Sequence, residues 1–198
     1  MAVTPAGTPY VETSDNVADY PGVSLALANH IDDTAGKVLQ VVSTTKTDTF
    51  SATVGVGANT AITGLTASIT PSATSSKILV IYGVAGGLNL AGGASGNNGI
   101  FTVLKRDSTA VSIGDEAGSR RRMTAGPGGA IGSVAVNSSS SATFLDSPST
   151  TSEITYSIDI GHTSGASQTV YLNRTDTDSN SSGYARLTSS ITLMEISA

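Results

Sequence analysis

From Lys37 onward the chain is a series of short, β-rich runs separated by turn-forming residues, and this pattern limits the fold more than any other feature. The run Ile154–Ile160 alternates apolar and polar side chains, as expected of a strand with one buried face. Lys77–Val84 (KILVIYGV) is the most hydrophobic run and predicts a central buried strand. Further strands are predicted at Val38–Val42, Phe50–Val56, Ile62–Ile69, Ile100–Leu104, Ile131–Val136, Ala142–Leu145, Thr169–Leu172 and Ile191–Ile196. Many short strands with frequent turns predict an all-β protein, a β-sandwich for which jelly-roll topology is expected.

Composition agrees with a strand-rich fold. Charged residues make up 13% of the chain, about half of the usual share of roughly 25%. Ser, Thr and Asn take the missing polar positions, and β-branched hydroxyl side chains suit the outer faces of pleated strands. The absence of cysteine excludes disulfides, thiolate metal sites and a cysteine nucleophile.

Charge and hydropathy also limit the partners that we expect. The formal net charge of −5 argues against binding to nucleic acid or to an anionic membrane, since both require concentrated Lys and Arg. No run is long and apolar enough for a membrane span, and no basic region followed by an apolar one opens the chain. We therefore expect synthesis in the cytosol, without a secretion signal and without membrane insertion.

Residues 1–36 differ in pattern from residues 37–198, and the boundary predicts an N-terminal arm followed by the β-sandwich domain. Met1–Thr13 is rich in Pro and Gly and is expected to be extended. Asp19-Tyr20-Pro21 is typical of a helix start, because proline is tolerated in the first turn. We expect one short helix after it, ending before Gly36.

The predicted helix has a single apolar stripe. Val23, Leu27 and Ile31 recur at intervals of four residues on about three turns. A helix of this length is marginal alone in water. Its stripe is therefore expected to pack on its own domain, on another copy of the chain or on a partner.

Two glycine-rich connections, Gly83–Gly99 and Gly114–Gly132, are too long for plain hairpins. Long loops on a rigid β-scaffold either form binding surfaces or are flexible decoration. The second contains the one basic cluster of the sequence, Arg120, Arg121 and Arg122, shortly after Asp115-Glu116. An ion-pair network, within the loop or between subunits, is one interpretation. The other is a receptor contact with an anionic surface glycan or lipopolysaccharide phosphate, whose oxygens match the arginine fork.

The residues needed for catalysis or metal binding do not form a recognisable pattern, so we expect no enzyme activity, cofactor or metal. His30 and His162 have no metal-ligand spacing, and His162 is expected in a turn after a strand. No serine lies in a G-x-S-x-G elbow. Asp176-x-Asp178-x-Asn180 alternates like a calcium loop but lacks its glycine and glutamate, and we interpret it as a polar hairpin turn. Glycosidase chemistry needs two positioned carboxylates, and nothing in the sequence pairs any two of Asp107, Asp115, Glu116, Asp146, Glu153 and Asp159.

Several segments resemble bacteriophage tail-fibre and virion fibre proteins. Tyr10–Asp32 (YVETSDNVADYPGVSLALANHID) is similar to their leading segment, with an aspartate, a Tyr-Pro pair and a short Ser/Leu/Ala helix. The β-domain of these proteins is similar to Lys37–Ser51 (KVLQVVSTTKTDTFS), Gly64–Val84 (GLTASITPSATSSKILVIYGV), Phe144–Ile158 (FLDSPSTTSEITYSI), Val170–Asp178 (VYLNRTDTD) and Ser189–Ile196 (SSITLMEI). Together these segments cover most of the chain.

The resemblance implies a structural protein of the virion, exposed on the particle, most simply a short trimeric tail fibre. The N-terminal arm would then attach to other phage structural proteins through Tyr10, Val11, Tyr20 and Pro21. The β-domain would contact the host cell surface, with a surface glycan as the expected partner. Because the chain lacks the long shaft of typical fibres, a capsid decoration, cement or head-fibre protein is the alternative. A free carbohydrate-binding or adhesin domain is a third.

The resemblance also implies a homotrimer, and the residues are compatible with one. A charge-poor surface can be buried between copies without leaving unpaired charges. The stripe formed by Val23, Leu27 and Ile31 is the expected seam between subunits.

Overall fold

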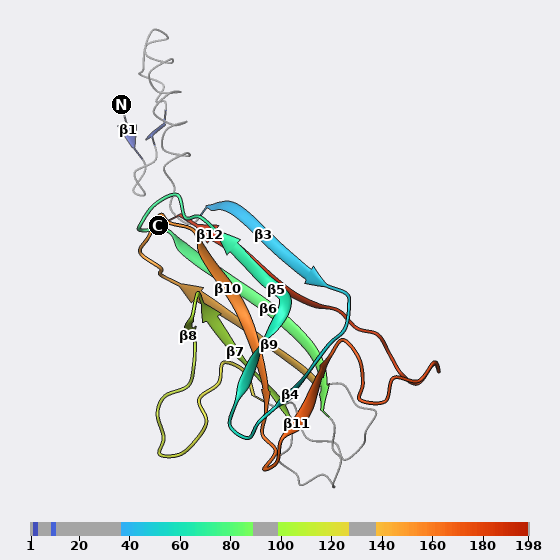
Figure 1. The fold of residues 1–198 in the computed structure, drawn as a ribbon. Helices are drawn as coiled ribbons and strands as arrows, with labels where there is room; N and C mark the ends of the chain where they lie inside the picture. Colours follow the sequence, from blue (N-terminus) through green and yellow to red (C-terminus); the bar gives the residue numbers. More distant parts are fainter. Residues whose placement is uncertain (1, 4–8, 11–36, 89–98, 127–137, 198) are drawn as a thin grey trace.

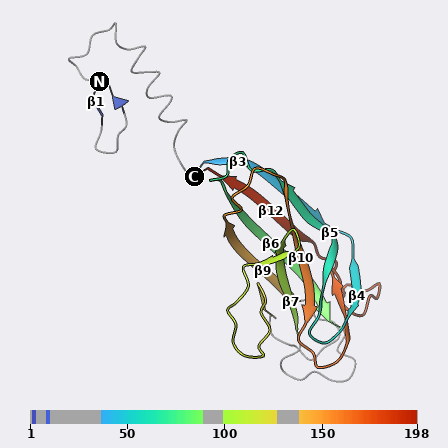
Figure 2. The same ribbon diagram turned by 60° about the vertical axis from the view of Figure 1, so that its left-hand side comes forward.

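The protein is described by a computed structural model that covers residues 2–3, 9–10, 37–88, 99–126 and 138–197. In these ranges the fold is all-β and contains no helix, and two antiparallel sheets pack face to face (Figures 1 and 2). The strands of the sandwich are β3 (Val38–Lys46), β4 (Phe50–Val54), β5 (Asn59–Ile69), β6 (Lys77–Leu88), β7 (Ile100–Arg106), β8 (Thr109–Val111), β9 (Ser138–Asp146), β10 (Ile154–His162), β11 (Gln168–Leu172) and β12 (Ser189–Ile196). The β-sandwich prediction is therefore confirmed.

The connectivity is that of a jelly roll. One sheet has the order β5-β10-β7-β8. In the other, β12 and β11 follow each other along one edge of β6, β3 and β4 flank them on the outside, and β9 pairs with the opposite edge of β6. If β3 with β4, and β11 with β12, are each counted as one interrupted strand, the sandwich has eight strands in the described residues, numbered 1 to 8 along the chain. The sheet that contains β6 then has the order 1-8-3-6, and the sheet that contains β10 has the order 2-7-4-5. This is the double Greek-key order of a jelly roll.

The core lies between the sheets and follows from the alternation in the sequence. Along β10, Ile154, Tyr156, Ile158 and Ile160 are all buried on the inner face. Neighbouring strands of the same sheet add Ile62, Leu65 and Leu104, and the opposite sheet contributes Ile78, Leu172, Ile191 and Leu193. Burial of this apolar surface, at about 25 cal/mol per Å², is the main favourable term for folding.

Asp146 joins the two sheets at a buried polar position. Its carboxylate accepts two hydrogen bonds from Arg106 of β7, at 3.0 and 2.8 Å, and one from the Tyr156 hydroxyl of β10 at 2.6 Å. Burial, followed by the adjacent carboxylate, raises the pKa of Tyr156 above its usual value of 10. Each acceptor oxygen is thus satisfied, so this carboxylate has a structural role.

Strand β6 corrects one loop prediction. The glycine-rich connection expected from Gly83 begins only after Leu88, because β6 continues through Gly83, Gly86 and Gly87. A Cβ at Gly86 would lie 2.7 Å from the Tyr171 carbonyl oxygen and 2.9 Å from Ile100 Cδ1. Glycine at this position therefore allows close packing of strands instead of forming a loop.

Other differences concern the lengths and number of the strands. The short strand β8 has no signal in the predicted pattern, and it follows a tight turn in which Asp107 has a φ of 54°. Strand β9 begins at Ser138, four residues before the predicted run, because its serines pair with β6. The strand expected at Ile131–Val136 lies outside the described residues.

The N-terminal region is described only at two short strands. Strand β1 (Ala2–Val3) pairs antiparallel with β2 (Pro9–Tyr10). The predicted helix, the attachment residues Val11, Tyr20 and Pro21, the side chain of Tyr10, His30 and the seam Val23, Leu27 and Ile31 lie outside the described residues. Those predictions, and the boundary between arm and domain, stay untested.

The chain enters and leaves the sandwich at one end. The Ser197 amide donates to the Lys37 carbonyl at 2.9 Å, and the Lys37 amide donates to Ser197 Oγ at 3.0 Å. Figure 1 shows the C-terminus beside the start of β3. Residues 1–36 therefore connect to the sandwich at this end and not at the opposite one.

The segment between β11 and β12 is an excursion rather than the predicted hairpin turn. Both strands pair with β6 and not with each other, so the prediction of a hairpin is wrong. Within the excursion, Asp178 forms ion pairs with Arg186 at 2.8 Å and with Arg174 at 3.3 Å. The hydrogen bond from Arg186 is the main cause that lowers the pKa of Asp178. Its carboxylate is neutralised by arginines.

Candidate ligand-binding groove

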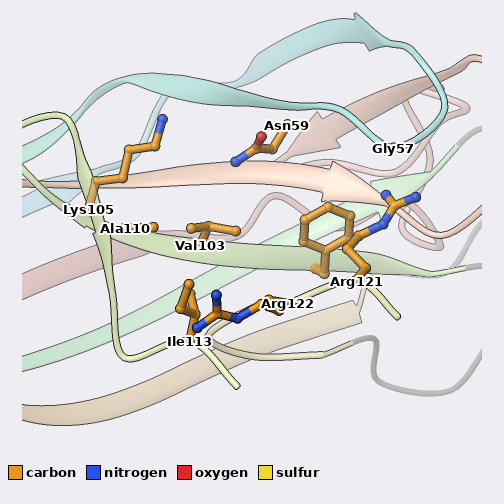
Figure 3. Close-up of a pocket in the computed structure, with 9 residues that line it drawn as sticks. Gly57, Asn59, Val103, Lys105, Ala110, Ile113, Arg121 and Arg122 are labelled. Atoms are coloured by element: carbon orange, nitrogen blue, oxygen red, sulfur yellow. The ribbon is translucent and has the colours of Figure 1, made fainter. Parts of the chain in front are cut away.

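A groove of about 280 Å³ lies on the outer face of the β5-β10-β7-β8 sheet, under the segment that follows β8. Its lining residues come from three strands and two connections. They are Gly57, Asn59, Phe101, Val103, Lys105, Ala110, Ile113, Arg121 and Arg122. Figure 3 shows Lys105 and Arg121 towards opposite ends of the groove, with Val103 between them.

The floor of the groove is apolar and is built by alternation along β7. Thr102 and Leu104 face the interior, so Phe101, Val103 and Lys105 point to the outer face. Phe101 is nevertheless only 2% exposed, because its ring lies against the neighbouring strand at Gly161. A Cβ at Gly161 would clash with Phe101 Cζ and would lie 2.7 Å from the Ala58 carbonyl oxygen. Only glycine at residue 161 leaves space for this ring.

Arg121 forms one end of the groove. Its guanidinium carbon lies 5.0 Å from the centroid of the Phe101 ring, within the range of a cation–π contact. Its Nη1 also donates a hydrogen bond of 2.7 Å to the carbonyl oxygen of His162. Two contacts thus fix the orientation of the planar guanidinium. An oriented guanidinium binds an oxyanion with less loss of side-chain entropy than a free one.

Lys105 carries the positive charge towards the other end. Its Nζ lies 2.6 Å from Asp159 Oδ2, and Asn59 Nδ2 donates to the same oxygen at 3.1 Å. Asp159 is buried, and its Oδ1 has no hydrogen-bond partner among the described residues. Lys105 remains 30% exposed. The ion pair therefore positions the ammonium group at the groove surface rather than hiding it.

The structure divides the arginine cluster predicted from the sequence. Arg121 and Arg122 line the groove, whereas the exposed Arg120 is not among its lining residues. Arg122 donates from Nε to the Gly114 carbonyl at 2.6 Å and pairs with Glu116 at 3.5 Å. Both interpretations of the cluster thus have a basis in the geometry, with an ion pair inside the loop and two guanidinium groups at a groove.

Most of the groove was not anticipated from the sequence. Phe101, Lys105 and Asn59 come from two strands, and only the fold brings them beside Arg121. Alternation within Ile100–Leu104 was a usable signal, since it places Phe101 and Val103 on one face.

His162 was predicted in a turn, and this is wrong. It is the last residue of β10 and fully buried, with Nε2 2.8 Å from the Val54 carbonyl oxygen.

The chemistry of the groove is that of binding. An apolar floor lies between cationic groups from Lys105, Arg121 and Arg122, which are only partly balanced by Asp159 and Glu116. Such a groove fits a ligand with an anionic group on a body of the size of a sugar. Across the described residues, no three His, Asp or Glu side chains are grouped to hold a metal ion. Within the same ranges, no helix has the length and apolarity of a membrane span.

Comparison with known proteins gives structural similarity alone. No family model and no curated protein matches the sequence. The structure of infectious bursal disease virus Gx strain is similar at 17% identity and a TM-score of 0.40, over 83% of this chain and 38% of that one. The crystal structure of the infectious bursal disease virus VP2 subviral particle is similar at 15% identity and a TM-score of 0.41, over 83% of this chain and 43% of that one. The chain thus spans less than half of either viral chain.

Proposed function

We propose that this protein is a non-enzymatic structural subunit of a bacteriophage particle, a short trimeric tail fibre whose β-domain contacts the host surface. The observation that carries the proposal is the polarity of the domain. The N-terminal segment, which resembles the attachment segment of phage fibres, joins the sandwich at one end. The groove runs along β7, and its Arg121 end lies at the other end of the sandwich.

Strand registers establish this polarity. At the end where the chain enters, Ile69 of β5 pairs with Ile154 of β10, and Gln40 donates to the nearby Thr70 carbonyl. At the far end, Asn59 pairs with Gly161, which in turn pairs with Phe101. Phe101 and Asn59 line the groove. A chain attached to a particle through its N-terminal segment would thus present the Arg121 end of this groove outward.

An anionic surface glycan, including the phosphate groups of lipopolysaccharide, is the ligand class that fits the groove. Guanidinium groups bind carboxylate and phosphate oxygens through paired hydrogen bonds. The apolar floor formed by Phe101 and Val103 can accept the less polar face of a sugar ring. One groove with so few anchors binds weakly, and several copies on one particle act together through avidity.

The test compares two substitutions in the arginine cluster. Arg121→Ala removes the oriented guanidinium from the groove, and Arg120→Ala removes the same charge one residue away, outside the groove. We expect Arg121→Ala to lower binding of the purified protein to host lipopolysaccharide about tenfold, since a charge-assisted hydrogen bond contributes about 1.5–3 kcal/mol. Adsorption of particles that carry the variant should fall in parallel. Arg120→Ala should bind like the wild type.

Incorporation into particles is measured alongside, so that an assembly defect is not mistaken for a loss of adsorption. If both variants bound lipopolysaccharide equally well, the groove would have no part in host attachment. If the wild-type protein bound lipopolysaccharide but were absent from purified particles, the virion role itself would be contradicted.

A second candidate is a capsid decoration, cement or head-fibre protein with no receptor role. The short spacing along the sequence favours it, because only residues 33–36 separate the fibre-like segment Tyr10–Asp32 from the start of the sandwich at Lys37. Localisation of the protein in a cryo-electron microscopy map of intact particles separates the two. Density at the tail supports the fibre, whereas density over the capsid lattice supports decoration.

A further inference from the structure

The outer face of the sheet opposite the groove carries an apolar row that crosses four strands. The registers place Val41 of β3 beside Met194 of β12, Met194 beside Leu79 of β6, and Leu79 beside Leu145 of β9. Val41 is 56% exposed and Leu145 is 52% exposed at the two ends of the row. Large apolar side chains in one continuous exposed row are unusual on a monomer and mark interaction surfaces.

The next two rows on one side of the apolar row are uncharged as well, whereas the row on its other side carries Lys77, whose Nζ donates to Ser147 Oγ at 3.0 Å. Ile81 extends the apolar surface in the next row, and it is 39% exposed. Ser43 and Thr192 in that row hydrogen-bond each other at 2.9 Å, which leaves fewer hydroxyl groups to be desolvated. These rows consist of Ser43, Thr192, Ile81 and Thr143, and of Thr45, Ser190, Gly83 and Ser141. We call the three rows the neutral face.

The neutral face differs from the rest of the molecule. The chain has 10 Lys or Arg and 15 Asp or Glu residues, and none of them belongs to the three rows. The outer face of the other sheet, in contrast, carries Lys105 and Asp159 and is partly covered by the segment that follows β8. Among the described residues, every exposed large apolar side chain except Val56 belongs to the sheet that carries the neutral face.

We infer that the neutral face packs against the neutral face of a second copy of this chain. Two copies with a net charge of −5 each repel at most relative orientations, and the repulsion is smallest where neither surface carries charge. A partner with a charged surface would instead have to desolvate its charges against the apolar row. The face thus matches itself better than it matches an ordinary charged surface.

The geometry also fits a two-fold pair. Sheets pack face to face with their strands roughly aligned, and a two-fold axis through the centre of the row brings Val41 of one copy over the partner's Leu145. Four strands about 4.8 Å apart, with five residues each from the first row to the third, give a face of roughly 15 by 17 Å. This is well below the usual interface of about 800 Å² per partner. The pairing is therefore weak in dilute solution. In the proposed trimer it would join a copy in one trimer to a copy in another, because a face that pairs with itself about a two-fold axis cannot close a three-fold ring.

This inference goes beyond the proposed function, because it assigns a self-association surface that needs neither a receptor nor the groove. Sedimentation equilibrium of the full chain tests it. We expect the wild type to self-associate with rising concentration. The double variant Val41→Asp, Leu145→Asp should weaken that association at least about tenfold, because it places like charges against each other. The control Thr66→Asp, at an exposed position on β5 of the other sheet, should associate as the wild type does.

A second measurement uses the absence of cysteine from the chain. Met194→Cys, near the centre of the row, should be joined into a covalent dimer by a short bis-maleimide cross-linker, because packed sheets lie roughly 10 Å apart, and Thr66→Cys should not. Thermal melts confirm that each variant is folded. A wild type that stays monomeric, or an Asp double variant that associates like the wild type, would overturn the inference. A monomeric protein whose double variant fails to enter particles would also overturn it, and would assign the face to another particle protein.

Discussion

At the scale of single residues, the groove depends on the absence of a side chain at residue 161. The Phe101 ring occupies the space that a Cβ at residue 161 would need, so such a Cβ would clash with Phe101 Cζ and lie 2.8 Å from Phe101 Cε1. We expect Gly161→Ala to lower the free energy of unfolding by about 1–3 kcal/mol, because the ring and the backbone at Ala58 must move apart. Urea unfolding followed by circular dichroism measures the change.

Gly165→Ala is the matched control for this prediction. Gly165 follows the same strand, and a Cβ there meets no atom within 4 Å. The control should unfold within about 0.5 kcal/mol of the wild type. Equal stability of Gly161→Ala and Gly165→Ala would show that the Phe101 ring is not held as described. Arg121 stacks on that ring, so Gly161→Ala should also weaken ligand binding in the groove.

At the scale of elements, Asn173 closes the base of the excursion between β11 and β12. Its φ is 58°, and its Nδ2 donates to the carbonyl oxygens of Lys46 and Asp48, both at 2.9 Å. Its Oδ1 accepts from Ser189 Oγ at 2.7 Å. One side chain thus connects the start of the excursion to its end and to the break between β3 and β4.

Two substitutions of Asn173 separate its hydrogen bonds from its backbone conformation. Asn173→Gly removes the hydrogen bonds but tolerates the positive φ, and it should cost about 1–2 kcal/mol of unfolding free energy. Asn173→Ala also adds the left-handed strain and should cost about 1 kcal/mol more. Chemical denaturation measures both. Asn180→Ala, exposed in the same excursion, is the control and should change little. An alanine variant as stable as the glycine variant would contradict the assigned strain.

The strands were predictable and the excursion was not, for a physical reason that Asn173 illustrates. Alternation in Ile154–Ile160 reports which face is buried, so strand identity can be read locally. The interruption between β11 and β12 depends on pairing with Gly86 and Gly83 of β6, which no local pattern encodes. The groove could not be predicted from the sequence for the same reason. Arg121 was visible in the sequence, but its partners, Phe101 and the His162 carbonyl, are placed by the fold.

At the scale of the whole molecule, a buried carboxylate links three parts of the sandwich at the end where the chain enters. Glu195 of β12 is 1% exposed. It accepts hydrogen bonds from the Ser72 amide at 2.7 Å, from Ser72 Oγ at 2.6 Å and from Gln40 Nε2 at 2.6 Å. Burial acts to raise the pKa of Glu195, but the hydrogen bonds from Ser72 and Gln40 outweigh it. The result is a pKa lowered from 4.5 to about 2.

This shift predicts how the stability of the domain depends on pH. A carboxyl group with a lowered pKa in the folded state stabilises the protein fully above its unfolded value of 4.5, and the contribution is lost as the pH falls to about 2. A shift of this size corresponds to roughly 3 kcal/mol, at about 1.4 kcal/mol for each pKa unit. Acid unfolding of the wild type should therefore be steep between pH 5 and pH 2.

Glu195→Gln tests the assignment by removing the titrating group and keeping its size. At neutral pH we expect the variant to be about 2–3 kcal/mol less stable than the wild type, because the buried donors lose a charged acceptor. The difference should shrink below pH 4.5 and be almost gone at about pH 2, where half of the wild-type carboxyl groups are already protonated. Urea unfolding at several pH values measures it, with the exposed Glu153→Gln as control. A stability difference that stays constant from pH 7 to pH 2 would mean that another carboxylate controls the acid limit of the sandwich.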